Sequence, residues 1–210
     1  PLTITGQTTG VEAGQSVTVT VNGKDYTGAV ASDGSFGITV PASDVELLSE
    51  QEYVATANVS DKAGNNAVED TENFFVDVTA GTITLNEITE DYLNAAEHND
   101  PLLITGTTTG VEAGQTVTIS LNGEDYRTTV KSDGTFEFTV PANKVGELVD
   151  GIVEVSVKVK DVAGNEVSDT EDFTVDTNVG RISLDDISED GYINTTDTEN
   201  PLVITGTTSG

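Results

Sequence analysis

Hydrophobic and polar positions alternate with a period of two residues along most of the chain. The clearest runs are VTISL at 117–121, FEFTV at 136–140 and VEVSVKVK at 153–160. Alternation of this kind is typical of strands with one buried and one exposed face, as in an antiparallel sheet. The turn dipeptides NG, DG and GN separate the runs. The pattern therefore predicts an all-β fold.

Seven strands are predicted in the middle of the chain. They are 83–85, 102–107, 116–121, 126–130, 135–140, 152–160 and 172–176. Seven short strands in roughly 100 residues are typical of an Ig-like Greek-key β-sandwich with two sheets. Their inward-facing members form the predicted core: Ile83, Leu85, Leu102, Ile104, Val117, Ile119, Leu121, Phe136, Phe138, Val153, Val155, Val157, Val159, Phe173 and Val175.

The sequence repeats itself with a period of 100 residues, or 99 where one residue is lost. The hexapeptide PLTITG, for example, returns as PLLITG and again as PLVITG. A period this long indicates tandem domains, because solenoid repeats are shorter, at about 20–45 residues. We expect a complete repeat at 78–177, an Ig-like repeat lacking its first strand at 1–77, and the N-terminal part of a third repeat at 178–210. The chain is then expected to be a fragment of a longer array.

The amino-acid composition argues against several classes of binding partner and of chemistry. With 37 acidic and 8 basic residues, the net charge is −29, so nucleic acid and anionic membranes would be repelled. No run of 18 apolar residues is present, which argues against direct membrane insertion. The absence of cysteine excludes disulfides and thiolate chemistry. No signal peptide is visible, and we expect export signals elsewhere in a longer protein.

The acidic residues gather in predicted loops and at strand ends. In a sandwich of this kind alternate loops lie at opposite ends. The loop at 90–100 should share one end with the closing Asp176, and the loop holding Asp161 and Asn165 should lie at the other. The closing Asp77 of the first repeat should in turn approach the second. We also expect Tyr92 to pack from its loop against the core.

Carboxylates that lie close together repel one another and destabilise the fold, and a bound hard divalent cation removes this repulsion. Calcium takes 6–8 oxygen ligands in flexible geometry, and extracellular modules bind it at about 10⁻⁴–10⁻³ M. The lack of cysteine and the single histidine disfavour softer transition metals. The alternative interpretation is that these are solvated loop residues, since Asp and Asn suit turns and no full EF-hand loop is present.

Four segments together resemble a known family: ITGTTTGVEAGQTVTISLNG, SDGTFEFTVP, VKVKDVAGNEVSD and FTVDT. They are similar to the bacterial Ig-like extender repeats of giant type I-secreted RTX adhesins of the biofilm, host-cell and ice-binding type. The resemblance implies secreted, extracellular repeats on the bacterial cell surface. They would project a distal adhesive domain, and Ca²⁺ at the inter-repeat junctions would rigidify the array. The ligands it implies are Asp77, Asp91, Asn94, Glu97, Asp161, Asn165, Asp176, Asp190, Asn194 and Asp197.

Threonine-rich strands and pairs of acidic residues raise two other functions. The repeat itself could bind a glycan or ice through its threonine-rich strands, although threonine is also a favourable exposed strand residue. Enzyme activity is not expected: Asp185 and Asp186 are adjacent, so in a strand they face opposite sides, and His98 is replaced by Thr198 in the next repeat.

The expected partners are neighbouring repeats of the same chain. A second contact follows from the division into repeats. Residues 1–77 lack a first strand and so expose an unpaired edge, whereas residues 180–210 carry a spare first strand. We therefore expect intermolecular strand donation by 180–210.

Overall fold

The computed structural model describes residues 1–188, 191–193, 195 and 201–210. It divides into two compact units, Pro1–Thr79 (unit 1) and Ala80–Gly210 (unit 2). This division falls two residues beyond the predicted boundary at 77/78, and it groups the predicted third repeat with the second. The predicted repeat boundaries stay predictions. None of the described helices is both long enough and apolar enough to cross a membrane.

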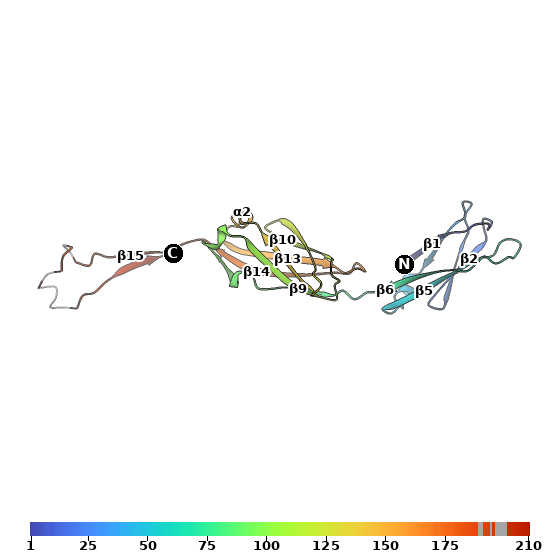
Figure 1. The fold of residues 1–210 in the computed structure, drawn as a ribbon, viewed down its shortest axis with the longest axis horizontal. Helices are drawn as coiled ribbons and strands as arrows, with labels where there is room; N and C mark the ends of the chain where they lie inside the picture. Colours follow the sequence, from blue (N-terminus) through green and yellow to red (C-terminus); the bar gives the residue numbers. More distant parts are fainter. Residues whose placement is uncertain (189–190, 194, 196–200) are drawn as a thin grey trace. The chain divides into compact units, whose positions relative to one another are not determined.

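Unit 2 is a two-layer sandwich (Figure 1). One sheet has the strand order β12-β9-β7 and the other the order β11-β10-β13-β14-β8. The bounds are β7 Thr82–Leu85, β8 Tyr92–Asn94, β9 Leu102–Thr109, β10 Thr116–Leu121, β11 Glu124–Thr129, β12 Thr135–Val140, β13 Gly151–Lys160 and β14 Glu166–Asp176, with the short helices η1 Thr89–Asp91, η2 Glu97–Asn99 and α2 Ala142–Val145. The predicted all-β, Ig-like sandwich is confirmed.

Two features of unit 2 differ from the expected strands. β14 begins at Glu166 rather than at residue 172, because its polar first half also pairs with β13, along the second half of that strand. β8 is an additional strand, only three residues long, that pairs in parallel with the end of β14. Neither a polar half-strand nor a three-residue strand gives an alternation long enough to recognise.

The core of unit 2 lies between the two sheets. All fifteen predicted core residues belong to it or pack against it, although Phe138 and Val153 are only half-buried. Further core residues come from the connections, among them Ile88, Leu93 and Leu148. Each fully buried side chain of this kind contributes about 1.5–3 kcal/mol, so the connections add substantially to stability.

Unit 1 repeats the architecture without two of its strands. Its sheets are β1-β4 and β3-β2-β5-β6, and among its described residues there is no counterpart of β7 or β8. The bounds are β1 Leu2–Gln7, β2 Ser16–Val21, β3 Lys24–Ala29, β4 Ser35–Val40, β5 Gln51–Asn58 and β6 Asp70–Val76, with α1 at Ala42–Val45. Its core is smaller, and Ile4 and Phe36 are half-buried where Ile104 and Phe136 are fully buried.

Beyond β14 the chain forms a separate two-stranded sheet of β15 (Arg181–Leu184) and β16 (Gly206–Ser209). Ile182 pairs with Thr208 and Leu184 with Gly206, in the register by which β7 pairs with β9. The apolar side chains of β15 are exposed, 79% for Ile182 and 64% for Leu184. This sheet therefore has the backbone pairing of a sandwich edge without its core.

Candidate metal-binding loops

The loop between β7 and β9 is anchored at the end of unit 2 where β14 finishes. β8 pairs in parallel with β14, so that Asn94 is the neighbour of Asp176. The anchor is Leu93, which is 1% exposed. Tyr92 is 61% exposed, so the prediction that it packs against the core is wrong. Successive strand residues face opposite sides, and Leu93 takes the inner one.

Asn94 and Glu97 hold each other in place at this end. The Asn94 Oδ1 accepts hydrogen bonds from the backbone N–H groups of Ala96 (2.9 Å) and Glu97 (3.2 Å). In return the Glu97 Oε2 accepts one from the backbone N–H of Asn94, at 3.1 Å. Both side chains are exposed, as is Asp91, whose φ of 72° lies in the left-handed region. The loop therefore presents fixed oxygen atoms to solvent.

A second acidic group, the closing turn, consists of Asp150 with residues 176–178. Asp150 Oδ1 accepts hydrogen bonds from the backbone N–H (2.9 Å) and hydroxyl (2.8 Å) of Thr177, and its Oδ2 accepts one from Asn178 Nδ2 (2.7 Å). The backbone N–H of Asn178 donates to Asp176 Oδ1 at 3.0 Å. Chiefly through the backbone N–H of Thr177, these bonds hold the pKa of Asp150 below its usual range.

The closing turn recurs in unit 1. Glu50 accepts hydrogen bonds from the backbone N–H of Val78, at 3.3 Å, and from the Thr79 hydroxyl, while the backbone N–H of Thr79 donates to Asp77 Oδ1 at 3.1 Å. Glu50 and Asp150 were not predicted as site residues, because they lie in turns outside the recognised motifs. The feature of the sequence that could have identified them is an acidic residue at the same position of both repeats.

Asp161 and Asn165 close the loop between β13 and β14. Asp161 is 4% exposed. Its Oδ1 accepts from the backbone N–H groups of Gly164 (2.7 Å) and Asn165 (2.8 Å), and its Oδ2 accepts from Asn165 Nδ2 (2.9 Å). These hydrogen bonds, above all the one from the Asn165 side chain, lower the pKa of Asp161. Asp61 and Asn65 repeat the arrangement in unit 1, with Asp61 less deeply buried.

The predicted ligands therefore occupy two separate places in unit 2. Asp91, Asn94, Glu97 and Asp176 lie at the end where β14 finishes, and Asp161 and Asn165 lie where it begins. β14 has 11 residues, and a rise of about 3.3 Å per residue puts about 33 Å between the two places. One unit does not bring all of these residues together. Asp190, Asn194 and Asp197 lie outside the described residues.

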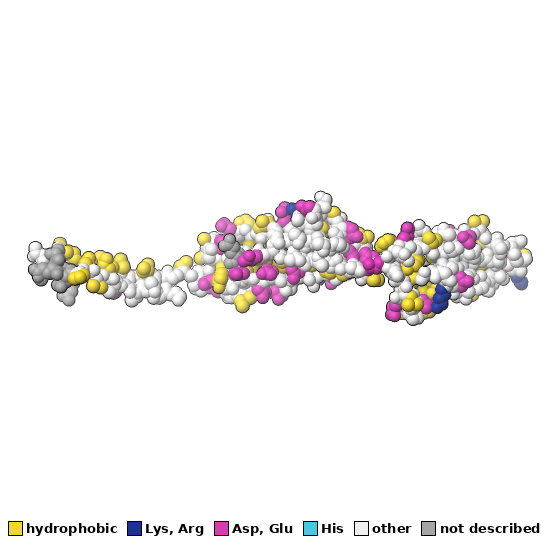
Figure 2. Space-filling view, turned by 90° about the horizontal axis from the view of Figure 1, so that it is seen from below, with side chains coloured by type: hydrophobic (Ala, Val, Ile, Leu, Met, Phe, Trp, Pro, Cys, Tyr) yellow, Lys and Arg dark blue, Asp and Glu magenta, His cyan; other side chains and the backbone are white. Residues whose placement is uncertain are grey.

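The donor atoms in these loops are suited to a hard cation. They are carboxylate, amide and backbone oxygens, the ligands that calcium prefers. Figure 2 shows acidic side chains spread over the visible face of unit 2 with few basic ones among them. Across the part of the chain that the structure describes, no three His, Cys, Asp or Glu side chains are grouped closely enough to hold a metal. A bound ion would therefore need further ligands from amides, backbone or water.

Fold and loops together define a class of protein: tandem Ig-like sandwiches whose ends carry acidic, hydrogen-bonded turns. The family model of the bacterial Ig-like domain matches residues 89–177. A bacterial Ig-like domain from the M. primoryensis ice-binding adhesin is 36% identical over 47% of this chain and 100% of its own length, with a TM-score of 0.40. The chain belongs to the bacterial Ig-like domain family.

Two longer structures are also similar. A Ca²⁺-stabilised adhesin that helps an Antarctic bacterium reach out and bind ice is 32% identical over 99% of this chain, with a TM-score of 0.49. A tetra-tandem repeat from the extending region of a large adhesion protein is 27% identical over 90% of this chain, with a TM-score of 0.42. The chain spans 52% and 48% of their lengths, about half of each. No curated protein matches the chain.

Proposed function

We propose that the chain is a structural extender of a secreted bacterial surface adhesin, holding a distal adhesive domain away from the cell, and that it is not an enzyme. The observation that carries this proposal is the repetition of the closing turn, with Glu50, Asp77 and Thr79 in one unit and Asp150, Asp176 and Asn178 in the next. A spacer needs the same unit end each time, whereas a binding or catalytic site needs to occur once. The similarity to an extending region of a large adhesion protein supports the same role.

We further propose that Ca²⁺ binds at the unit ends and stiffens the links between neighbouring repeats. The ligands are the predicted Asp77, Asp91, Asn94, Glu97, Asp161, Asn165, Asp176, Asp190, Asn194 and Asp197. The oxygen donors fixed by β8 and by the closing turn support calcium there, as does the similarity to an adhesin described as stabilised by Ca²⁺. Asp161 contributes mainly by ordering its own loop, because both of its oxygens already accept hydrogen bonds.

Thermal unfolding tests the calcium proposal. For a dissociation constant of about 10⁻⁴–10⁻³ M, roughly 10 mM free Ca²⁺ stabilises the folded unit by about 1.4–2.7 kcal/mol. We expect a higher melting temperature in Ca²⁺ than in chelator or in Mg²⁺, together with a narrower distribution of solution dimensions by X-ray scattering. Equal melting temperatures and dimensions in Ca²⁺ and chelator would refute calcium stiffening and leave the family assignment intact.

A matched pair of variants locates the site. Asp176→Asn removes one carboxylate charge from the closing turn, and Glu154→Gln removes one from an exposed position within β13. We expect Asp176→Asn to reduce the calcium-induced rise in melting temperature and Glu154→Gln to leave it unchanged. An equal effect of both variants would show that calcium only screens the net charge of −29.

A further inference from the structure

A cluster of basic side chains lies on the outer face of the five-stranded sheet of unit 2. Thr118 of β10 pairs with Arg127 of β11 on one side and with Lys158 of β13 on the other, so the three side chains form one row across the sheet. Neighbouring strands are about 4.8 Å apart, which places the two cations of the row about 10 Å from each other. Lys160, two residues further along β13, extends from the same face. Arg127, Lys158 and Lys160 are called the basic cluster below.

The basic cluster is unusual for so acidic a chain. It holds three of only eight basic residues, against 37 acidic ones, and all three side chains are exposed. Within the described residues, neither Arg127 nor Lys158 forms an ion pair, whereas Lys160 lies 3.7 Å from Glu166. The carboxylate of Asp125, two residues before Arg127, accepts a hydrogen bond from a serine of β10. Two cations of the cluster are therefore available to an external anion.

The basic cluster borders an open hollow of about 360 Å³. Uncharged side chains with hydrogen-bonding groups, those of Gln115, Thr116 and Thr118, line the same hollow. Among the described residues that line it, Glu166 is the only acidic one and none is aromatic. The hollow therefore offers positive charges separated by hydrogen-bonding groups, without an aromatic ring on which a ligand could stack.

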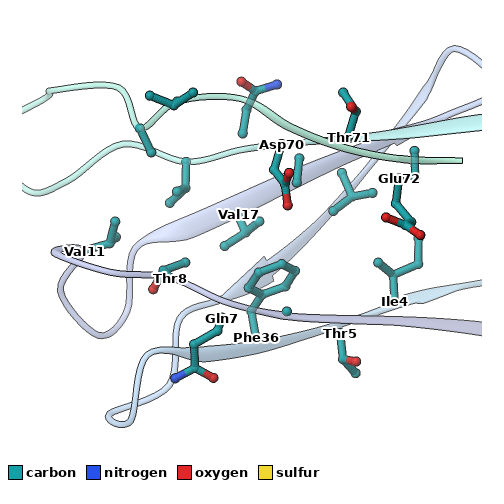
Figure 3. Close-up of a pocket in the computed structure, with 18 of the residues that line it drawn as sticks. Ile4, Thr5, Gln7, Thr8, Val11, Val17, Phe36, Asp70, Thr71 and Glu72 are labelled. Atoms are coloured by element: carbon teal, nitrogen blue, oxygen red, sulfur yellow. The ribbon is translucent and has the colours of Figure 1, made fainter.

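Among its described residues unit 1 has no such cluster. Thr27, Asn58 and Ser60 stand at the positions of the three cations, so the corresponding row of unit 1 is uncharged. Figure 3 shows a hollow of unit 1, and the only charged side chains among its described lining residues are the acidic ones of Asp70 and Glu72. The basic cluster is therefore a feature of unit 2, and the architecture that the two units share does not require it.

We propose that the basic cluster of unit 2 binds an acidic polysaccharide. Such a polymer carries carboxylate or sulfate groups separated by hydroxyls, which matches cations separated by threonine and glutamine side chains. Single-stranded nucleic acid fits less well, because its bases stack on aromatic side chains. Duplex DNA carries one charge per about 1.7 Å, so the net charge of −29 repels it more than a polysaccharide with one charge per sugar. The contact adds a point of attachment to the extender and does not depend on calcium.

NMR titration of the full chain with an oligomer of galacturonate tests the site. The titration is done in chelator, so that Ca²⁺ cannot bridge two acidic partners. We expect shifts of the amide resonances of Thr118, Arg127 and Lys158 that weaken with added salt, and none at the unit 1 counterparts Thr18 and Thr27. The methyl-esterified oligomer keeps the hydroxyls but has no charge, and it should cause no shifts. Dextran sulfate shows whether sulfate groups bind as well as carboxylates.

Two variants with the same change of charge test the side chains. The first carries the residues of unit 1 at the basic cluster: Arg127→Thr, Lys158→Asn and Lys160→Ser. The second loses three exposed positive charges elsewhere: Lys62→Ser, Lys131→Ser and Arg181→Thr. The first should bind the galacturonate oligomer about tenfold more weakly, because three exposed ion pairs are lost. The second should change the affinity by less than about twofold, because distant exposed charges are screened by salt.

Three results would overturn the proposal. One is the absence of shifts at the basic cluster with both the galacturonate oligomer and dextran sulfate at low salt. Another is an equal loss of affinity in the two variants, which would show a response to net charge alone. The third is binding of polyglutamate or of oligo-dT at the cluster as tight as that of the polysaccharides, which would make an acidic protein or a nucleic acid the partner.

Discussion

Replacing Leu93 by alanine tests whether the three-residue strand β8 is a structural anchor. Leu93 is 1% exposed and lies in the core of unit 2, between the exposed Tyr92 and Asn94. Truncation of a fully buried leucine costs about 2–5 kcal/mol, because transfer free energy is lost and a cavity is left. A loss of about 3 kcal/mol lowers the melting temperature of a unit of this size by roughly 12–24 °C.

The assay is calorimetric unfolding of the full chain, in which unit 1 serves as an internal reference because it does not contain the substituted residue. Tyr92→Ala is the matched control on the outer face of the same strand and should change stability by no more than about 0.5 kcal/mol. Leu93→Ala should also weaken the calcium effect, because Leu93 holds Asn94 beside Asp176. Equal, small effects of the two substitutions would refute the anchoring role.

Three further outcomes follow from the structure. Hydrogen bonds lower the pKa of Asp161 in the folded state. The ionised side chain therefore contributes its full stabilisation above the pKa of the unfolded state, about 4, and this stabilisation is lost as the pH falls through the pKa of the folded state. The melting temperatures of wild type and Asp161→Asn should converge in acid. Gly164→Ala should destabilise unit 2 by more than about 1 kcal/mol in denaturant unfolding, because φ there is +97°. Phe136→Ala should cost about 3–5 kcal/mol and Phe36→Ala clearly less, since Phe136 is 1% exposed and Phe36 is only half-buried; equal costs in denaturant unfolding would refute this reasoning.

Most of the fold could be predicted from the alternation of hydrophobic and polar residues, because burial of one face of a strand requires an apolar side chain at every second position. The strands at 116–121 and 135–140 have the predicted bounds. The period failed where the inner face of a strand is mostly polar, as in the first half of β14. β8 was missed because a single inward side chain, Leu93, makes no pattern.

The candidate site was harder to predict, because its geometry depends on hydrogen bonds between distant loops. Asp150 reaches Thr177 and Asn178 across 27 and 28 positions of the sequence. Only the fold brings these residues together. Asp161 was predicted as a ligand from the family resemblance and from its place in a loop, but in the structure its oxygens accept hydrogen bonds from N–H groups of its own loop. Residue type alone does not distinguish a carboxylate that orders a turn from one that faces a cation.

The parallel pairing of β8 with β14 has a mechanical consequence for unit 2. The chain enters through β7 and β8 and leaves from the last residues of β14, Thr174 to Asp176, which are paired with Tyr92 to Asn94. A pull on the two ends of the unit slides these parallel strands along each other, so their hydrogen bonds bear the load together instead of opening one at a time. Unit 2 should therefore resist stretching between its two ends.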